Sequence, residues 1–395
     1  MRDRPMSIRF PYSCPELTDA DVGAVVETLK GQFLTQGPKL ADFEVALAQT
    51  LGAKHAVVCN SGTAGLHLAY LALNLGPGRG LLTTPLTFLA TANAARMCDA
   101  PVVFCDTDPG TGNVTPETVA EAIDAAGTSV AAVCVVHLGG RSCDMPALRE
   151  MTAARGIALI EDACHAPLAG YSDRSGGTHT VGACVHSDIA VFSFHAIKHV
   201  AMGEGGAILT NDDRVANRAR LYRNHGITRD PRDWKNPPEV DAPWYYEMHE
   251  VGWNYRATEM QCALGLSQLG RIEEGIRRRR ALAKRYDQLL SGLNHLAVPP
   301  YDDGHVWHLY PVAIDFDAVG KTRGRVMREL AERGIGTQVH YIPVNRQPYY
   351  DHGDRMPTPA AEAYYSRTLS IPMYPGLSDS DVELIAAEIR AVLRH

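Results

Sequence analysis

Between residues 55 and 210 the chain alternates short apolar runs, rich in β-branched residues, with stretches in which apolar residues recur at helical spacing. The strand-like runs are residues 55–59, 81–83, 101–104, 130–136, 157–161, 189–194 and 206–210, and the helical stretches are 63–73, 87–97, 116–126 and 145–154. This alternation predicts βαβ units and therefore an α/β fold, with a mostly parallel sheet covered by helices on both faces. Ligands of such sheets bind beyond the carboxyl ends of the strands, so a site is expected there.

The pattern changes at residues 228–250, a stretch rich in Pro, Asp and Trp. Its apolar residues follow neither the helical nor the strand period, which indicates a long loop. Helices are expected at 257–269, 271–293, 322–333 and 378–393, and strands at 307–314 and 336–341. We therefore predict a large domain over residues 1–262 and a smaller α+β domain over residues 263–395. Four consecutive arginines, residues 277–280, point in different directions on a helix, and we expect them to be solvated.

Composition narrows the possible partners. The 395 residues carry 38 basic and 45 acidic side chains, a net charge of −7, which lacks the basic surplus of nucleic-acid-binding proteins. No window approaches the roughly 18 apolar residues of a membrane span. The nine cysteines form an odd set without a CxxC pair, and several lie inside apolar runs. We expect free thiols, a cytoplasmic location, and neither nucleic acid nor membrane as a partner.

A metal site is not expected. Asp106, Asp108 and Glu117 have the spacing of the first, third and twelfth positions of a calcium loop. Thr111, however, occupies the sixth position, where the turn needs glycine. No Cys/His set has the spacing of a zinc site.

Three short segments carry recognisable chemistry. Lys198 follows a buried strand in SFHAIK and precedes the glycine-rich GEGG, where desolvation would lower the pKa of the amine and make it nucleophilic. Asp162 in EDACH ends the preceding strand, where an anion could hold the pyridine nitrogen of pyridoxal phosphate (PLP) protonated. In NSGTAGLHL a strand end leads through a small polar turn into a helix, whose free N–H groups and dipole favour phosphate. Each segment also has a plain structural explanation when it is taken alone. Lys198 can be a surface lysine, Asp162 can cap a helix, and the turn in NSGTAGLHL can be an ordinary helix cap.

Together with TTPLTFLATANA and GWNYRATEMQCALGLSQL, these segments resemble the sugar aminotransferases of the DegT/DnrJ/EryC1/StrS family, from about residue 10 to residue 379. The resemblance implies the type I fold of PLP-dependent transferases, PLP as cofactor, and a homodimer whose active sites are shared between subunits. It implies Lys198 as the lysine that binds PLP, Asp162 as the partner of the pyridine nitrogen, and His165 as the neighbour of the ring's 3-oxygen. The remaining cofactor positions that it implies are Thr63, Ala64 and Ser193 at the phosphate, Asn254 reaching the phosphate from the neighbouring subunit, and Phe88 stacking on the ring.

The resemblance also suggests substrates. Some relatives that replace the lysine with histidine are sugar dehydratases, so the presence of Lys198 favours transamination, with L-glutamate as the implied donor. RNHGITRD and GIGTQVHYIPV most resemble the C4 transaminases of the pseudaminic acid pathway, which act on a UDP-4-keto-6-deoxy-N-acetylhexosamine. Asn345 departs from this subfamily, where histidine is common. Another keto-sugar, a PLP-dependent sugar dehydratase and a PLP-binding sensor without turnover remain alternatives.

Aromatic and histidine side chains are the candidates for contact with the sugar nucleotide, because rings stack and hydroxyl and imidazole groups form hydrogen bonds. A core or interface role is equally open for each of them, and for His225 a structural role is favoured. The candidates are His308, Tyr310, His340 and Tyr341, with Trp244 and Tyr245 of the long loop, which we expect to close over the sugar.

Overall fold

The computed structural model describes residues 8–126, 129–238, 240–351 and 356–394. Its centre is a seven-stranded sheet in the order β1-β9-β8-β5-β4-β2-β3. The strands are β1 (His55–Cys59), β2 (Gly80–Thr83), β3 (Val102–Phe104), β4 (Val130–Val136), β5 (Ala158–Asp162), β8 (Ile189–Ser193) and β9 (Gly206–Thr210). Within this sheet β9 alone runs antiparallel to its neighbours, so the predicted mostly parallel α/β sheet is confirmed.

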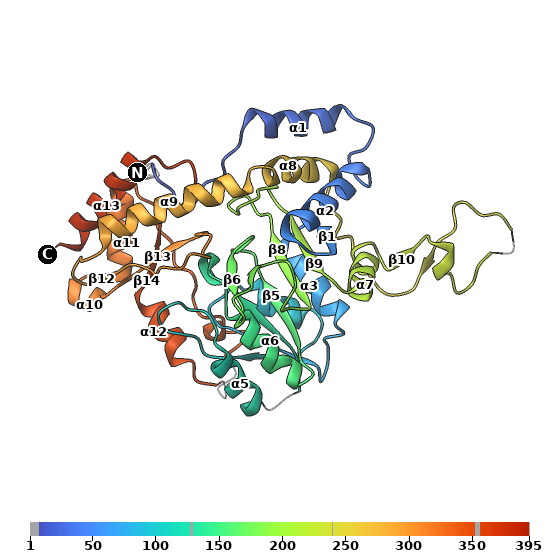
Figure 1. Cartoon of the computed structure of the whole chain (residues 1–395), viewed down its shortest axis with the longest axis horizontal. Helices are drawn as coiled ribbons and strands as arrows, with labels where there is room; N and C mark the ends of the chain where they lie inside the picture. The colour runs from blue at the N-terminus through green and yellow to red at the C-terminus, as the bar shows by residue number, and fades with distance from the viewer. Residues whose placement is uncertain (1–7, 127–128, 239, 352–355, 395) are drawn as a thin grey trace, which may run out of the picture.

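Helices cover both faces of this sheet (Figure 1). Its strands are therefore buried on both sides. The core on one face joins the sheet to α3 (Gly62–Ala72), α4 (Ala90–Arg96) and α7 (Asp213–Arg223). On the other face lie α2 (Pro38–Leu51), α5 (Pro116–Ala125) and α6 (Met145–Ala154). Successive residues of β5 alternate between the two cores: Leu159 packs with α5 and α6, and Ile160 packs with α3.

The C-terminal part builds a separate core around a three-stranded antiparallel sheet. Its elements are β12 (Leu296–Ala297), β13 (Tyr310–Ile314), β14 (Thr368–Ile371), α9 (Ile272–Leu290), α10 (Phe316–Val319), α11 (Arg323–Glu332), α12 (Pro359–Arg367) and α13 (Asp379–Leu393). The strand expected at residues 336–341 is reduced to one bridge between Gln338 and Ser370. Phe10 joins this core from the N-terminal segment.

The expected domain boundary at residue 262 falls inside α8 (Glu259–Leu269), which packs against α1 (Asp19–Lys30) and α2. The core on the α2 side of the large sheet and the C-terminal core meet along the long helix α9. Ile276 belongs to the core on the α2 side, and Leu282 belongs to the C-terminal core. The helix therefore connects the two parts continuously (Figure 1).

Residues 227–248 form an arm that projects from the body of the protein (Figure 1). It begins and ends in the two-stranded pair β10 (Ile227–Thr228) and β11 (Glu247–Met248), and contains a 3₁₀ turn at Pro231–Asp233. The long loop expected here is thus closed at its base by a short β ladder. A second small pair, β6 (Gly170–Ser172) and β7 (Thr178–Thr180), lies beyond β5.

In the part of the chain that the structure describes, no helix is both long and apolar enough to cross a membrane. The same residues contain no group of three metal-binding side chains. All nine cysteines are free thiols.

Candidate active site

Lys198 lies in the loop after β8, at the carboxyl end of the parallel strands. Its N–H donates to the carbonyl of His195 at 2.9 Å, which closes a tight turn, and Ser13 of the N-terminal segment donates to the carbonyl of Ile197 at 3.4 Å. The side chain is half-buried. Burial lowers the pKa of Lys198 below the ordinary value for lysine, although nearby Cys164 and Asp162 oppose the shift. A less basic amine is a better nucleophile and proton carrier at neutral pH.

Asp162 ends β5, the strand next to β8, with Val191 opposite it. The carboxylate is 6% exposed and accepts hydrogen bonds from the Thr91 hydroxyl at 2.7 Å and from the Cys164 N–H at 3.2 Å. Thr91 has only one hydroxyl proton, so Thr87, whose oxygen lies 2.7 Å from that of Thr91, donates to Thr91. A chain of two threonines therefore orients the carboxylate.

The start of α3 forms the third part of the site. Ser61 caps the helix by accepting the N–H of Ala64 at 3.1 Å. A Cβ at Gly62 would lie 2.8 Å from the Cβ of Ser193, so only glycine lets the helix approach the end of β8 this closely. The N–H groups of the first turn of a helix favour an anion. Because Ser61 already uses the N–H of Ala64, those of Gly62 and Thr63 are the better placed donors.

Rings surround the lysine on the remaining side. His165 lies 4.4 Å from His308 and 6.1 Å from Tyr341 between ring centroids, and Phe88 lies 6.3 Å from Tyr341. Burial, followed by the charge of Lys198, lowers the pKa of His165 well below its ordinary value. The neutral ring accepts the Gly139 N–H at Nδ1 (3.3 Å), which assigns its proton to Nε2, 3.1 Å from the Tyr341 hydroxyl.

Two of the four substrate candidates are engaged in the protein interior. Tyr310 is fully buried in the C-terminal core and its hydroxyl donates to Asp287. The expectation that Tyr310 lines a sugar cleft is therefore replaced by the core role. His340 is 6% exposed and lies 2.8 Å from the Ser370 hydroxyl through Nδ1. His308 and Tyr341 remain beside His165.

Other residues singled out in the sequence lie elsewhere. Trp244 and Tyr245 belong to the arm, and Trp244 is 69% exposed. Asn254 is exposed, and its carbonyl accepts the Asn60 side chain at 3.4 Å beside the start of α3. Asn345 is buried and donates to the Thr358 hydroxyl at 3.0 Å, so this departure from the pseudaminic subfamily concerns an interior contact.

His225, exposed on the surface, adopts a positive φ of 59° at the base of the arm. Its N–H donates to the carbonyl of Trp253 at 3.0 Å. The backbone of His225 therefore helps to form the base of the arm. Among the described residues, no hydrogen bond or ring contact joins His225 to the lysine loop.

Sequence reasoning missed residues that long-range folding brings to the site. Thr91 orients Asp162, and Tyr12 packs 5.5 Å from His340 between ring centroids. His199 follows Lys198 directly, and its ring lies 5.6 Å from that of His308. Thr91 stood within the quoted TTPLTFLATANA segment, but nothing local in that segment indicates that it faces Asp162.

The chemistry of these side chains fits PLP. The site combines an amine of lowered pKa, an oriented carboxylate, a helix start and an aromatic ring, Phe88, that is 61% exposed beside the other rings. The cofactor needs a lysine, an anion for its ring nitrogen and donors for its phosphate. Lys198, Asp162 and the α3 start with Ser193 have those chemical properties.

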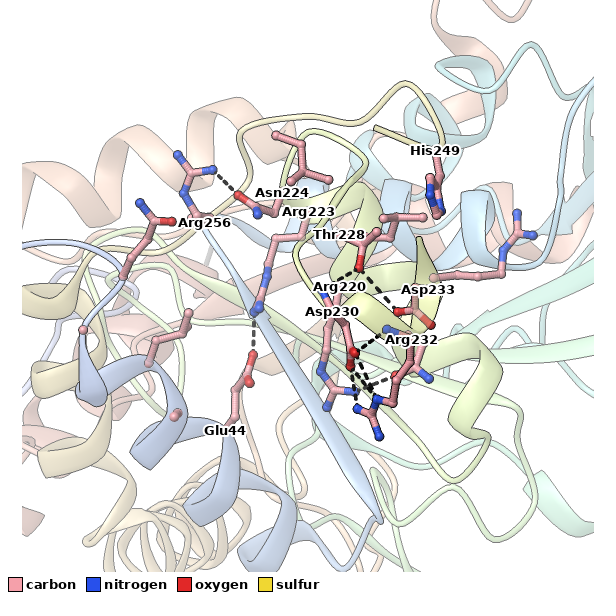
Figure 2. A pocket seen from close by; sticks show the side chains of 18 of the residues that line it. Glu44, Arg220, Arg223, Asn224, Thr228, Asp230, Arg232, Asp233, His249 and Arg256 are labelled. Atoms are coloured by element: carbon pink, nitrogen blue, oxygen red, sulfur yellow. Dashed lines mark hydrogen bonds and ion pairs between the residues drawn. The ribbon is translucent and has the colours of Figure 1, made fainter. Parts of the chain in front are cut away.

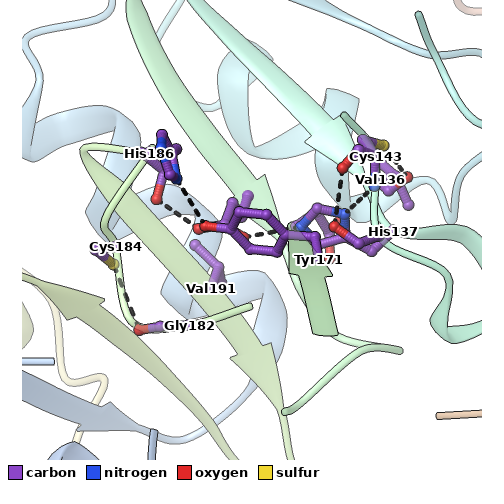
Figure 3. Close-up of polar contacts among 12 residues, drawn as sticks. Val136, His137, Cys143, Tyr171, Gly182, Cys184, His186 and Val191 are labelled. Atoms are coloured by element: carbon purple, nitrogen blue, oxygen red, sulfur yellow. Dashed lines mark hydrogen bonds and ion pairs between the residues drawn. The ribbon is translucent and has the colours of Figure 1, made fainter. Parts of the chain in front are cut away.

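The reverse side of β5 forms a separate polar cluster (Figure 3). His137 accepts the Cys143 N–H at Nδ1 (3.1 Å) and therefore donates from Nε2 to Glu161 at 2.9 Å. Ser187 donates to the other oxygen of Glu161 at 2.5 Å. Tyr171, 3.2 Å from His186 through its hydroxyl, borders this cluster.

A wide cavity of about 910 Å³ lies at the base of the arm (Figure 2). Two of its arginines, Arg223 and Arg232, form ion pairs, whereas other arginines of the lining bond to neutral groups. Arg223 pairs with Glu44 at 2.5 Å, and Arg256 donates to Asn224 at 2.6 Å. None of the residues that the sequence assigned to PLP lines this cavity.

Comparison with known proteins identifies relatives over the whole chain. The model of the DegT/DnrJ/EryC1/StrS aminotransferase family matches residues 15–390. The spore coat polysaccharide biosynthesis protein SpsC of Bacillus subtilis is 38% identical over 98% of this chain and 97% of its own length. The structure resembles the aminotransferase TlmJ from Streptoalloteichus hindustanus, with a TM-score of 0.86, 33% identity and coverage of 97% of this chain and 98% of that one. Helicobacter pylori PseC, an aminotransferase of pseudaminic acid biosynthesis, also gives a TM-score of 0.86, at 29% identity over 97% of this chain and 99% of its own.

Proposed function

Because the chain belongs to the DegT/DnrJ/EryC1/StrS aminotransferase family, whose members depend on PLP, we propose that it transfers an amino group from L-glutamate to C4 of a UDP-4-keto-6-deoxy-N-acetylhexosamine. The observation that carries the proposal is that Asp162 and Lys198 follow the carboxyl ends of the adjacent strands β5 and β8, and that the α3 start, which follows β1, lies against Ser193 at the end of β8. The enzyme would act in the cytoplasm. PLP, when bound, supplies an electron sink for the carbon that gains or loses the amino group.

Each residue of the site then has a specific task. Lys198 would bind the cofactor, and its amine of lowered pKa would move a proton to and from the reacting carbon through Nζ. Asp162, held by Thr91, keeps the ring nitrogen protonated. Thr63 and Ser193 hold the phosphate with the N–H groups of the first turn of α3, to which Ala64 contributes less because Ser61 occupies its N–H.

The remaining two cofactor residues complete the arrangement. Phe88 offers an exposed ring for stacking. His165 stays neutral, because burial lowers its pKa, and directs a proton through Tyr341 toward the cofactor's 3-oxygen.

The acceptor is proposed from the relatives. PseC is an aminotransferase of pseudaminic acid biosynthesis, and SpsC is a protein of spore coat polysaccharide biosynthesis. We favour the pseudaminic type of acceptor, UDP-4-keto-6-deoxy-N-acetyl-altrosamine. Asn345 donates to the Thr358 hydroxyl, so its difference from the usual histidine falls on a contact within the chain. Tyr341 and His308, which is 1% exposed, are the proposed sugar contacts, and the His340 ring packs against that of Tyr341.

The active unit is proposed to be a homodimer. The arm projects from the body of the subunit (Figure 1). Asn254 is exposed and bridged to Asn224, just before the arm, where it can meet a second copy. Asn254 would reach the phosphate of the neighbouring site. Mixing inactive Lys198→Ala and Asn254→Ala subunits should restore about a quarter of wild-type activity, because half of the random dimers contain one intact site. No recovery after verified subunit exchange would exclude the shared site.

The first experiment is the visible absorption spectrum of the protein reconstituted with PLP, before and after L-glutamate. The proposal requires a visible band that L-glutamate abolishes, and then a UDP-4-keto-sugar that restores it with formation of an amino sugar. A band unaffected by any amino acid would favour the sensor. Loss of a sugar hydroxyl without amino transfer would favour the dehydratase, against which the presence of Lys198 argues.

A further inference from the structure

A second opening reaches Lys198 from the side of the N-terminal segment. It is a cavity of about 390 Å³ between residues 14–18, the lysine loop and the start of α9. Its described charged lining residues are Lys198, Arg271, Arg278, Arg279, Glu16 and Glu274. Neither Phe88 nor Tyr341 lines it, so this cavity approaches the lysine from a side different from that of the aromatic rings.

Arg279 is the unusual member of this lining. The side chain is 2% exposed and donates only to backbone carbonyls, those of Trp307, His308 and Met373, at 3.2, 3.3 and 2.8 Å. Within the described chain no carboxylate forms an ion pair with it. Buried guanidinium groups are normally paired with an anion, because carbonyl dipoles solvate the charge without neutralising it.

The other two arginines of the cavity show the usual arrangement. Arg271 pairs with Asp21 at 2.5 Å, and Arg278 pairs with Asp379 at 2.8 Å. Arg279 is thus the one of the three that forms no ion pair with a carboxylate of the described chain. Burial lowers the pKa of Arg279 to about 10, although the charge of Glu16, which lines the same cavity, acts to raise that pKa. Arg279 therefore stays charged at neutral pH.

His199 provides a second polar group that needs a partner. It lines the same cavity, and its Nε2 is buried with no hydrogen-bond partner in the described structure. Burial, followed by the charge of Arg279, lowers the pKa of His199 well below its ordinary value, so the ring is neutral. A buried ring nitrogen without a partner is costly unless a ligand or water satisfies it.

We propose that this cavity binds a carboxylate of the amino donor, with Arg279 as the cation that receives it; the inference rests on the proposed aminotransferase function. The planar guanidinium matches a carboxylate in shape and charge. The described lining contains no Phe, Tyr or Trp on which a nucleotide base could stack. The cavity therefore suits a small dicarboxylate such as L-glutamate, and the sugar nucleotide is left to the side that carries Phe88 and Tyr341.

Gly275 allows the cavity to be filled without removing a charge. It lies in α9, lines the cavity, and a Cβ there would meet only Pro375 Cγ, at 3.9 Å. Gly275→Leu should therefore place its side chain in the cavity while the backbone stays in position. Gly23→Leu in α1 is the matched control, because a Cβ at Gly23 meets nothing within 4 Å.

Binding can be measured without turnover through Cys14, an exposed thiol that also lines the cavity. Glutarate, a dicarboxylate without an amino group, should slow alkylation of Cys14 in the PLP-loaded, full-length protein at least about fivefold at saturation. The same protection is expected in Gly23→Leu and should be lost in Gly275→Leu. Protection by UDP but not by glutarate, no protection by either, or full protection in Gly275→Leu would each overturn the proposal.

The donor reaction gives a second measurement. In Gly275→Leu the L-glutamate concentration that gives half of the maximal rate of band loss should rise at least about tenfold. Gly23→Leu should match the wild type, and an unchanged value in Gly275→Leu would contradict the donor site. A wild-type protein that never reacts with L-glutamate would instead contradict the proposed function, whereas the protection of Cys14 by glutarate reports on the cavity alone.

Discussion

Two consecutive carboxylates at the end of β5 have opposite surroundings. Glu161 faces the α5 and α6 side, where it is 1% exposed and receives hydrogen bonds from His137 and Ser187. Asp162 faces the α3 and α4 side, where Thr91 and one backbone N–H donate to it. Both side chains are buried, so burial alone does not distinguish a structural carboxylate from a catalytic one.

The difference lies in the polar groups around each carboxylate. Near Glu161, His137 uses both of its ring nitrogens within the protein. Around Lys198, which lies near Asp162, His308 Nδ1 and His199 Nε2 are buried without a hydrogen-bond partner in the described structure. Unpaired buried polar atoms cost free energy that a ligand can recover. We infer that the Glu161 side stabilises the sheet and that the Asp162 side is completed by ligands.

The largest effect should come from Lys198→Ala. Removal of the amine eliminates the group that binds the cofactor and moves the proton, and turnover should fall by at least about 1,000-fold. Circular dichroism and the unfolding midpoint should stay close to those of the wild type, because the Lys198 side chain makes no hydrogen bond in the part of the chain that the structure describes. Near-normal turnover would remove the basis for placing the chemistry on this side of β5.

Asp162→Asn should come next, with a fall in turnover of roughly 100-fold. Asparagine keeps the size of the side chain but cannot hold a proton on the ring nitrogen by its charge. The fold should tolerate this change, because the Thr91 hydroxyl can rotate to accept from the new amide. Turnover within a factor of two of the wild type would show that the two carboxylates do not differ in function.

Glu161→Gln is the matched change on the other side and should affect stability more than chemistry. The neutral His137 ring must keep its proton on Nε2, because its Nδ1 accepts the Cys143 N–H. Its Nε2 therefore cannot accept from an amide at position 161. Glutamine can keep its oxygen toward His137 while the Ser187 hydroxyl rotates to accept from the amide, so the loss is limited to the extra strength of two hydrogen bonds to a charged carboxylate, about 1 kcal/mol in the free energy of unfolding. Urea unfolding measures this loss, and activity per folded molecule should change little. A large fall in that activity with unchanged stability would contradict the division between the two sides.

The sequence predicted the local parts of this arrangement well. The central strands could be located because apolar runs between helical stretches are local signals, and Asp162 and Lys198 follow the ends of two such runs. The direction of each side chain follows from the alternation of faces along a strand. What could not be obtained locally is the partner that each side chain meets after folding.

Arg279 shows how such a partner was missed. The run of four arginines was expected to be solvated, yet Arg279 is buried and bonded to three carbonyls, which corrects that expectation. A signal was present: Ile276, Arg279 and Tyr286 follow one another at intervals that place them on one face of α9. The acceptors themselves come from residues 307, 308 and 373, which no helical period can indicate. Phe10 and Tyr12 were missed for the same reason, because they pack against the C-terminal part of the chain.

The smallest effect, and the sharpest test of the comparison, should come from Thr91→Val. Valine has the shape of threonine without the hydroxyl, so Asp162 loses a 2.7 Å hydrogen bond while the packing is retained. If Thr91 acts by positioning this carboxylate, kcat should fall about tenfold and the KM for L-glutamate should stay unchanged. Thr91→Ser restores the hydroxyl and should restore kcat, provided the smaller side chain leaves the helix in place. Near-normal kcat in Thr91→Val together with a loss in Thr91→Ser would indicate a packing role instead, because valine keeps the shape of threonine and serine lacks the methyl group.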